Sequence, residues 1–147
     1  MQTIALIDYG AGNLRSVERA LEAAARQART PSRIVMTDDA EIARKADRIV
    51  LPGQGAFDDC MNAIQRHELI GGVKNFIKTG RPFLGICVGY QALFERSEEF
   101  NSCALGFGLF KGKVRRFTEK TGLKIPQIGW NQLEIAQPNC PIFKDIS

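Results

Sequence analysis

The strongest constraint on the fold of this chain is one order of elements that occurs four times. A short, mainly apolar segment is followed by a turn and then by a helical pattern, with the apolar segments at residues 3–8, 32–36, 47–53 and 81–86. These segments lack the regular apolar–polar alternation of a half-exposed strand, so they suit strands that are buried on both faces. The repeated order therefore predicts an α/β architecture with a mainly parallel sheet.

The segments between the predicted strands have the patterns of helices. The first has apolar residues at helical spacing and follows Asn13, a residue type that often caps helix N-termini. The second has acidic residues before basic ones, which complements a helix dipole. Helices are expected at residues 14–28, 38–46, 58–66, 68–78 and 89–99. After Phe100, strands are expected in "GLFKGKVRRF" and "NQLEIAQ".

Length and charge narrow the class of protein. A chain of 147 residues suits one domain with a sizeable core, and we expect a single domain over residues 1–147. No apolar run is long enough for a transmembrane helix, and the N-terminus lacks the features of a signal peptide, so we expect a cytoplasmic protein. The net charge of +4 comes without a Lys/Arg block, so we expect no nucleic-acid ligand.

Cysteine and histidine usage argues against a metal site. The chain has a single histidine and four scattered cysteines without a CxxC pair. We therefore expect free thiols and no metal. The glycine-rich segments match neither the P-loop nor the GxGxxG motif, and no cofactor is expected.

A cysteine between two glycines is the most informative local pattern. In "GICVGYQ", Gly85 and Gly89 flank Cys87 at the spacing of a nucleophile elbow, a sharp strand-to-helix turn that leaves no room for side chains two residues away. The oriented N–H groups of the following helix would favour the thiolate, and the N–H of Val88 could bind an oxyanion. The pattern is short, so an inert thiol in a close helix packing remains an alternative.

A second glycine-rich turn lies in "LPGQGAF", residues 51–57. Its bare backbone N–H groups could supply another oxyanion donor, although a simple strand-to-helix turn is the alternative. Ligands of parallel α/β sheets bind outside the carboxyl ends of the strands. The turns at residues 9–13, 52–57 and 87–89 are all expected at that edge and can be neighbours in space.

Six segments in a fixed order carry a resemblance to a known family. They are "DYGAGNL", "VLPGQGAFDDCM", "RPFLGICVGYQALFE", "SEE", "GLFKGKVRRF" and "IPQIGWNQ". Together they resemble the glutaminase subunit of imidazole glycerol phosphate synthase, a class I (triad-type) glutamine amidotransferase of histidine biosynthesis. The cysteine corner and PGxG loop are shared by class I members, whereas "GAGN" and "GWN" point to this branch. The resemblance implies a flavodoxin-like three-layer sandwich.

The resemblance also implies a mechanism without a cofactor. Cys87 would attack the side-chain amide of glutamine, releasing ammonia and leaving a thioester that water hydrolyses. By match to the family motifs, the oxyanion region would comprise Gly53, Gln54 and Val88. The α-amino and α-carboxylate groups of glutamine would be held by Gln91 and Glu99. Asn13 would face a cyclase subunit with a (β/α)8 barrel, the partner in a heterodimer that receives the ammonia.

The class I triad is Cys, His and Glu, and its last two members are not found at their expected place. The family's His-x-Glu segment follows a stretch like "CPIFKDI", and this sequence stops there at Ser147, so we expect a domain that lacks its C-terminal segment. The only histidine, His67, lies upstream of Cys87 and does not match the catalytic histidine. An isolated histidine without a motif is usually an ordinary surface residue, and we expect this for His67.

Three smaller departures and three interpretations remain. Gln127 stands where the family usually has histidine, Gln54 replaces a small apolar residue, and Tyr90 replaces a common methionine.

The chain could be a shortened glutaminase subunit that is inactive alone. It could instead be a glutaminase of another class I enzyme, but the "GAGN" and "GWN" segments argue against this. It could also be a non-catalytic module that keeps a partner-binding face.

Overall fold

The computed structural model describes residues 1–10, 12–119, 122 and 124–143. The chain divides into two compact units, Met1–Arg116 and Phe117–Ser147. The first unit contains a four-stranded sheet in the order β2-β1-β3-β4, with every neighbouring pair parallel. The strands are β1 (Gln2–Ile7), β2 (Ser32–Thr37), β3 (Arg48–Gly53) and β4 (Phe83–Cys87). All four strands predicted from the apolar segments are therefore confirmed.

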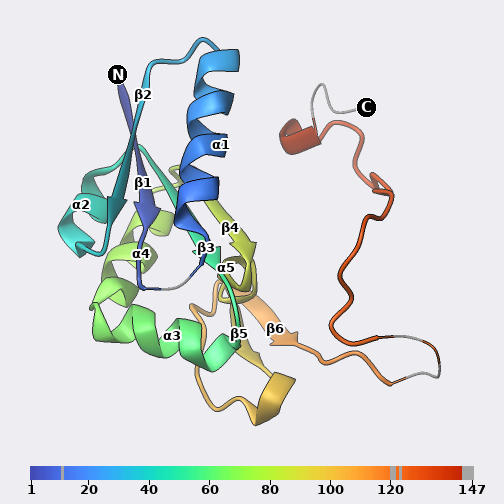
Figure 1. Cartoon of the computed structure of the whole chain (residues 1–147). Coiled ribbons are helices and arrows are strands. Elements are labelled where there is room, and N and C mark those ends of the chain that lie inside the picture. Colours follow the sequence, from blue (N-terminus) through green and yellow to red (C-terminus); the bar gives the residue numbers. More distant parts are fainter. Residues whose placement is uncertain (11, 120–121, 123, 144–147) are drawn as a thin grey trace. The chain divides into compact units, whose positions relative to one another are not determined.

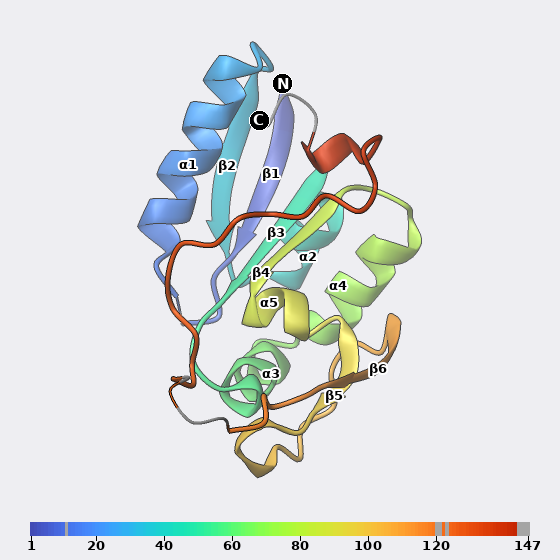
Figure 2. The same ribbon diagram turned by 90° about the vertical axis from the view of Figure 1, so that its right-hand side faces the viewer.

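Helices cover both faces of this sheet (Figures 1 and 2). Helix α1 (Leu14–Gln27) packs on one face, where Ile4, Leu6 and Val50 are buried. The opposite face carries the larger core and packs against α2 (Ala40–Lys45), α3 (Phe57–Arg66) and α4 (Leu69–Lys78). Alternate residues of β1 supply the two cores, as expected for a strand that is buried on both sides.

This strand order is the one of flavodoxin-like folds, so the predicted fold class is confirmed. Asn13 caps α1 as predicted, because its side-chain oxygen accepts a hydrogen bond from the N–H of Ser16 at 3.2 Å. At the outer edge of the sheet, β4 pairs with β3 alone within the described part of the Met1–Arg116 unit. Two aliphatic side chains of β4 are partly open to solvent there, Leu84 at 45% and Ile86 at 37%.

The helix predicted at residues 89–99 is wrong. The structure has the four-residue helix α5 (Val88–Gln91), then strand β5 (Phe94–Ser97) and a 3-10 turn η1 (Glu99–Asn101). Strand β5 pairs in parallel with β6 (Phe110–Val114), the strand predicted in "GLFKGKVRRF".

Distant backbone groups explain why the helix stops so early. The carbonyl oxygens of residues 92–95 accept hydrogen bonds from N–H groups of residues 106–110 instead of continuing an α-helix. Gly106 makes this approach possible, since a Cβ atom there would lie 2.1 Å from the carbonyl oxygen of Phe94. Long-range pairing has therefore overridden a local helical pattern.

The Phe117–Ser147 unit contains little regular structure in its described part. A 3-10 turn η2 spans Pro141–Phe143. The strand predicted in "NQLEIAQ" is wrong, because residues 131–137 form no strand. In the family-like segment "IPQIGWNQ", Ile128 and Trp130 are exposed. A strand needs a neighbour for its N–H and C=O groups, and the described residues of this unit supply none.

Candidate active site

Cys87 occupies a sharp corner between strand and helix. It is the last residue of β4 and directly precedes α5, and its φ of 56° lies in the left-handed region that side chains other than glycine rarely adopt. The residue is exposed. A strained backbone that presents an exposed nucleophilic side chain is the geometry that the sequence pattern predicted.

The two flanking glycines are required by close backbone contacts. A Cβ atom on Gly89 would lie 1.9 Å from the carbonyl oxygen of Leu51, and one on Gly85 would lie 2.7 Å from backbone atoms of Gly89 and Tyr90. Both positions therefore exclude any larger residue. The helix behind Cys87 is shorter than expected, so the support that its N–H groups give to a thiolate comes from a single turn.

The PGQG loop lies directly beside the cysteine corner. Gly53 and Cys87 are register partners at the ends of β3 and β4. A Cβ atom on Gly53 would lie 2.2 Å from the N atom of Gly89, which shows how closely the two turns pack. Val88 is buried at this junction, and Gln54 follows Gly53 as an exposed residue. The structure therefore brings Gly53, Val88 and Cys87 together, as predicted.

Tyr9 joins the first turn to the PGQG loop, a role that the sequence patterns did not reveal. Its hydroxyl group donates a hydrogen bond of 2.8 Å to the carbonyl oxygen of Pro52, and the thiol of Cys60 donates to the same hydroxyl at 3.3 Å. Burial, together with the Cys60 thiol, raises the pKa of Tyr9 far above its usual value, so the phenol stays neutral. The three turns thus meet as expected.

Replacing Tyr9 by phenylalanine should loosen this junction. The variant keeps the ring but leaves the buried carbonyl oxygen of Pro52 without its donor, so we expect Tyr9→Phe to lower the free energy of unfolding by about 1–3 kcal/mol. Urea denaturation followed by circular dichroism measures the change. The control is Tyr90→Phe, since Tyr90 is 51% exposed. Equal midpoints for the two variants would show that the Tyr9 hydroxyl does not stabilise the loop.

The remaining predicted site residues lie on different elements. Gln91 ends α5 and is half-buried. Glu99 begins η1, after β5, and its N–H donates to the hydroxyl oxygen of Ser97 at 3.0 Å. Asn13 lies at the start of α1, which packs on the opposite face of the sheet from α3. Tyr90 is exposed and makes an edge-on ring contact with Phe94.

His67 is placed too far away to serve Cys87 as a base. It follows α3, at the break predicted before α4, and its Nδ1 atom lies 3.3 Å from a carboxylate oxygen of Asp38. Asp38 comes directly after β2, and β2 and β4 are at opposite edges of the sheet. Three strand spacings separate these edges, about 14 Å in all.

The four thiols differ in exposure, which allows a direct test of the corner. Cys60 is buried and Cys140 is half-buried, whereas Cys87 and Cys103 are exposed. The thiol of Cys103 donates weakly to the carbonyl oxygen of Asn101, at 3.6 Å. We expect Cys87 to be alkylated first by limiting iodoacetamide and Cys60 last. Mass spectrometry of the labelled peptides gives the order, and Cys103 reacting as fast as Cys87 would contradict it.

A cavity of about 500 Å³ lies elsewhere, against the side of α3 and α4. Its lining includes residues of the segment that follows η1, but not Cys87. This cavity is therefore not the place where chemistry at Cys87 would occur. No helix in the described part of the chain is both long and apolar enough to cross a membrane.

Comparisons with known proteins agree on one family. The sequence model described as "Glutamine amidotransferase class-I" matches residues 5–146. The chain is 45% identical over 143 residues to "Imidazole glycerol phosphate synthase subunit HisH" of Synechococcus elongatus, covering 97% of this chain and 62% of that protein. The protein of the same name from Neisseria meningitidis is 45% identical over 152 residues, covering 99% of this chain and 69% of that protein.

A solved structure supports the fold alone. A peptidase E-like protein from Listeria monocytogenes matches with a TM-score of 0.51 at 16% identity, over 64% of this chain and 50% of that one. This chain spans a little under two thirds of the length of the Synechococcus relative.

Proposed function

This chain belongs to the class I glutamine amidotransferases, and from that premise we propose that it acts as the glutaminase part of an imidazole glycerol phosphate synthase in histidine biosynthesis. Its reaction would hydrolyse glutamine to glutamate and ammonia. The family match runs through both compact units, which supports one amidotransferase domain over residues 1–147.

The observation that carries this proposal is the position of Cys87. The thiol stands exposed on a left-handed corner, next to backbone that three glycines keep bare of side chains. Such a corner offers a nucleophile beside backbone that carries no side chains, which suits acyl transfer to a thiol.

The chemistry proceeds in two steps. The Cys87 sulfur bonds to the amide carbon of glutamine, and the negative oxygen that develops is stabilised by the N–H of Val88 and by backbone of the Gly53–Gln54 loop. The carbon–nitrogen bond then breaks, and the nitrogen takes up the proton that the thiol has lost and leaves as ammonia. Water attacks the resulting thioester, which releases glutamate and restores the thiol.

Two residues are assigned to the backbone groups of glutamine. The carboxylate of Glu99 suits the α-ammonium group, and the side-chain amide of Gln91 can donate to the α-carboxylate. The α5 turn carries Gln91 next to Cys87, and Glu99 follows on the segment that leaves β5. These positions support a glutamine that lies across α5 with its amide at the corner.

The partner would be the cyclase subunit of the same enzyme, a (β/α)8 barrel that receives ammonia. The names of the relatives describe a subunit of imidazole glycerol phosphate synthase, which supports a heterodimer. Asn13 would face this partner from the first turn, which Tyr9 connects to the PGQG loop. We place the enzyme in the cytoplasm and assign it no cofactor.

A diazoketone analogue of glutamine tests the proposal without requiring turnover. The Cys87 thiol gives its proton to the diazo carbon, and the sulfur then bonds to that carbon as dinitrogen leaves. We expect a single adduct on Cys87, slowed by added glutamine and absent in Cys87→Ser. An adduct that forms equally on Cys103, or that glutamine does not slow, would contradict a glutamine site at this corner.

The position of His67 favours a second candidate function. A non-catalytic partner module would bind glutamine or a cyclase without turnover, and it fits the placement of His67 beside Asp38, which follows the strand at the opposite edge of the sheet from β4. Binding of the cyclase with no increase in ammonia release would support this candidate, whereas glutamine turnover upon adding the cyclase would exclude it.

A further inference from the structure

The segment that carries Glu99 has an unusual backbone. Phe100 and Asn101 are adjacent, neither is glycine, and both lie in the left-handed region with φ values of 52° and 54°. Such conformations persist only where the surrounding structure holds them in place. The contacts of residues 98–104, which we term the Glu99 loop, therefore hold this conformation in place.

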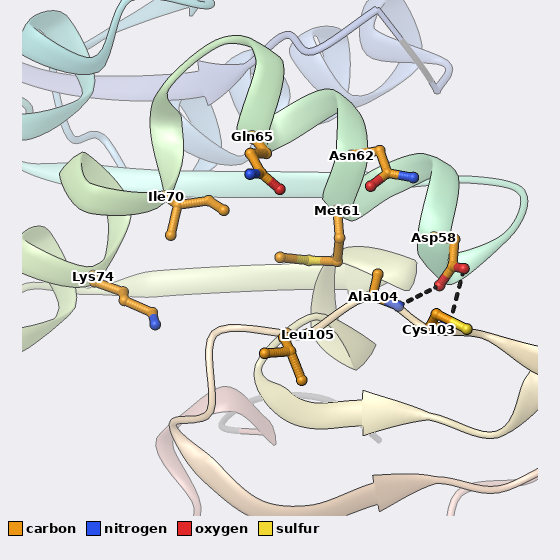
Figure 3. Close-up of a pocket in the computed structure, with 10 residues that line it drawn as sticks. Asp58, Met61, Asn62, Gln65, Ile70, Lys74, Cys103, Ala104 and Leu105 are labelled. Atoms are coloured by element: carbon orange, nitrogen blue, oxygen red, sulfur yellow. Dashed lines mark hydrogen bonds between the residues drawn. The ribbon is translucent and has the colours of Figure 1, made fainter.

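The Glu99 loop is fixed at both ends. At its start, the hydroxyl oxygen of buried Ser97 accepts the N–H of Glu99. At its other end, the carboxylate of Asp58 accepts three hydrogen bonds, from the Ser102 hydroxyl and from the N–H groups of Cys103 and Ala104, the last two at 3.1 Å each. Figure 3 shows Asp58 reaching from α3 to this segment.

Asp58 belongs to the helix that directly follows the PGQG loop. It lies in the first turn of α3, which begins at Phe57, and its bonds span 44 to 46 residues of sequence. The Ser102 hydroxyl and the Cys103 N–H lower the pKa of Asp58, so the carboxylate stays ionised at neutral pH and can accept all three bonds. One side chain thus joins the start of α3, which follows the PGQG loop, to the segment that carries Glu99.

We propose that Asp58 is a positioning residue, which clamps the Glu99 loop in the conformation that binds glutamine. This inference rests on the proposed function, because it assigns Glu99 to the substrate. Without the clamp, the left-handed residues relax and Glu99 leaves its place, while the cysteine corner keeps its own backbone contacts.

Asp58→Asn removes the clamp with little change in size. The amide has one acceptor oxygen in place of two, and its NH2 group would face a backbone N–H that needs an acceptor. The matched control is Asp59→Asn, because Asp59 is an exposed carboxylate in the same first turn. The control reproduces the loss of one negative charge at the helix N-terminus.

The first measurement is the concentration of glutamine that halves the rate of Cys87 alkylation by limiting iodoacetamide. We expect Asp58→Asn to raise this concentration about tenfold or more. Asp59→Asn should leave it unchanged. Without glutamine, the rate of Cys87 alkylation should be equal in the wild type, Asp58→Asn and Asp59→Asn. A general loss of structure in a variant would change this rate.

The second measurement is amide hydrogen exchange of Cys103 and Ala104 in the free proteins, which does not depend on glutamine. We expect exchange to be about tenfold faster in Asp58→Asn and unchanged in Asp59→Asn. If Asp58→Asn does not fold, Ser102→Ala removes one of the three bonds and should raise the glutamine concentration about threefold.

The outcomes separate the two proposals. If glutamine does not slow alkylation of the wild-type protein, the proposed function fails, and faster exchange in Asp58→Asn still supports the clamp on the loop. If glutamine protects the wild type and both asparagine variants equally, the positioning role of Asp58 is overturned and the function stands. Unchanged exchange at Cys103 and Ala104 would overturn the clamp itself.

Discussion

Gly89→Ala is expected to destabilise the Met1–Arg116 unit by about 3 kcal/mol or more, at the upper end of the costs of overpacking. The added Cβ atom would lie 1.9 Å from the carbonyl oxygen of Leu51 and 2.9 Å from its carbonyl carbon. Both are backbone atoms of β3, so no side chain can rotate away. Relief requires β3 and α5 to separate, which opens the junction of the PGQG loop and the cysteine corner.

Urea denaturation measured by circular dichroism provides the test, and the chain offers a matched control. Gly71 lies inside α4, and a Cβ atom there meets nothing within 4 Å. Gly71→Ala should raise the free energy of unfolding by about 0.5–1 kcal/mol, because alanine is the better helix former. Similar unfolding midpoints for the two variants would show that the contact at Gly89 does not constrain the fold.

Ammonia release from glutamine by the 147-residue polypeptide is expected to be about 10²–10⁴-fold below that of an amidotransferase with a positioned histidine. The departing nitrogen needs a proton, and the donor must come within about 3 Å of the reacting atoms. The single histidine is paired with Asp38, which follows β2 at the opposite edge of the sheet from β4. The expected rate is equally low with a cyclase present.

Two variants decide what produces any ammonia that is released. His67→Ala should leave a low residual rate unchanged, since the His67–Asp38 pair is exposed and of little structural value. Cys87→Ala should abolish that rate. Substantial release that His67→Ala abolishes would identify His67 as the base after all. Substantial release that depends on Cys87 but not on His67 would show that this chain does not need a triad.

The features that could be predicted are those that depend on residues close together in the sequence. The strands were found because segments such as 48–53 are apolar on both faces, and the corner because a sharp turn at Cys87 demands glycines at fixed spacing. The helix at 89–99 was wrong because residues 92–95 pair with residues 106–110. A local sequence pattern does not reveal pairing with a distant segment, which here competes with the hydrogen bonds of a helix.

The same reason explains why two site residues were missed. Tyr9 contacts Pro52 across 43 positions, and Asp58 contacts Ser102 across 44. A tyrosine at the end of a strand and an aspartate in the first turn of a helix are both common, and neither has a motif that indicates its distant partner. Gln91 and Glu99 were predicted through family resemblance alone, whereas the glycine patterns also indicated the oxyanion donors at Val88 and in the PGQG loop. All these roles remain predictions that the alkylation and trapping experiments can test.

The outer edge of β4 has a consequence for the protein in concentrated solution. Within the described residues of the Met1–Arg116 unit, β4 pairs on one side only, beside partly exposed Leu84 and Ile86, and such an edge can template the addition of a strand from another molecule. Arg81 and Pro82 directly precede this strand. A charge and a proline disfavour the pairing of another strand, and these two residues lie at the amino end of β4. Colloidal stability should therefore fall as concentration rises, with aggregation beginning at the strand that carries Cys87.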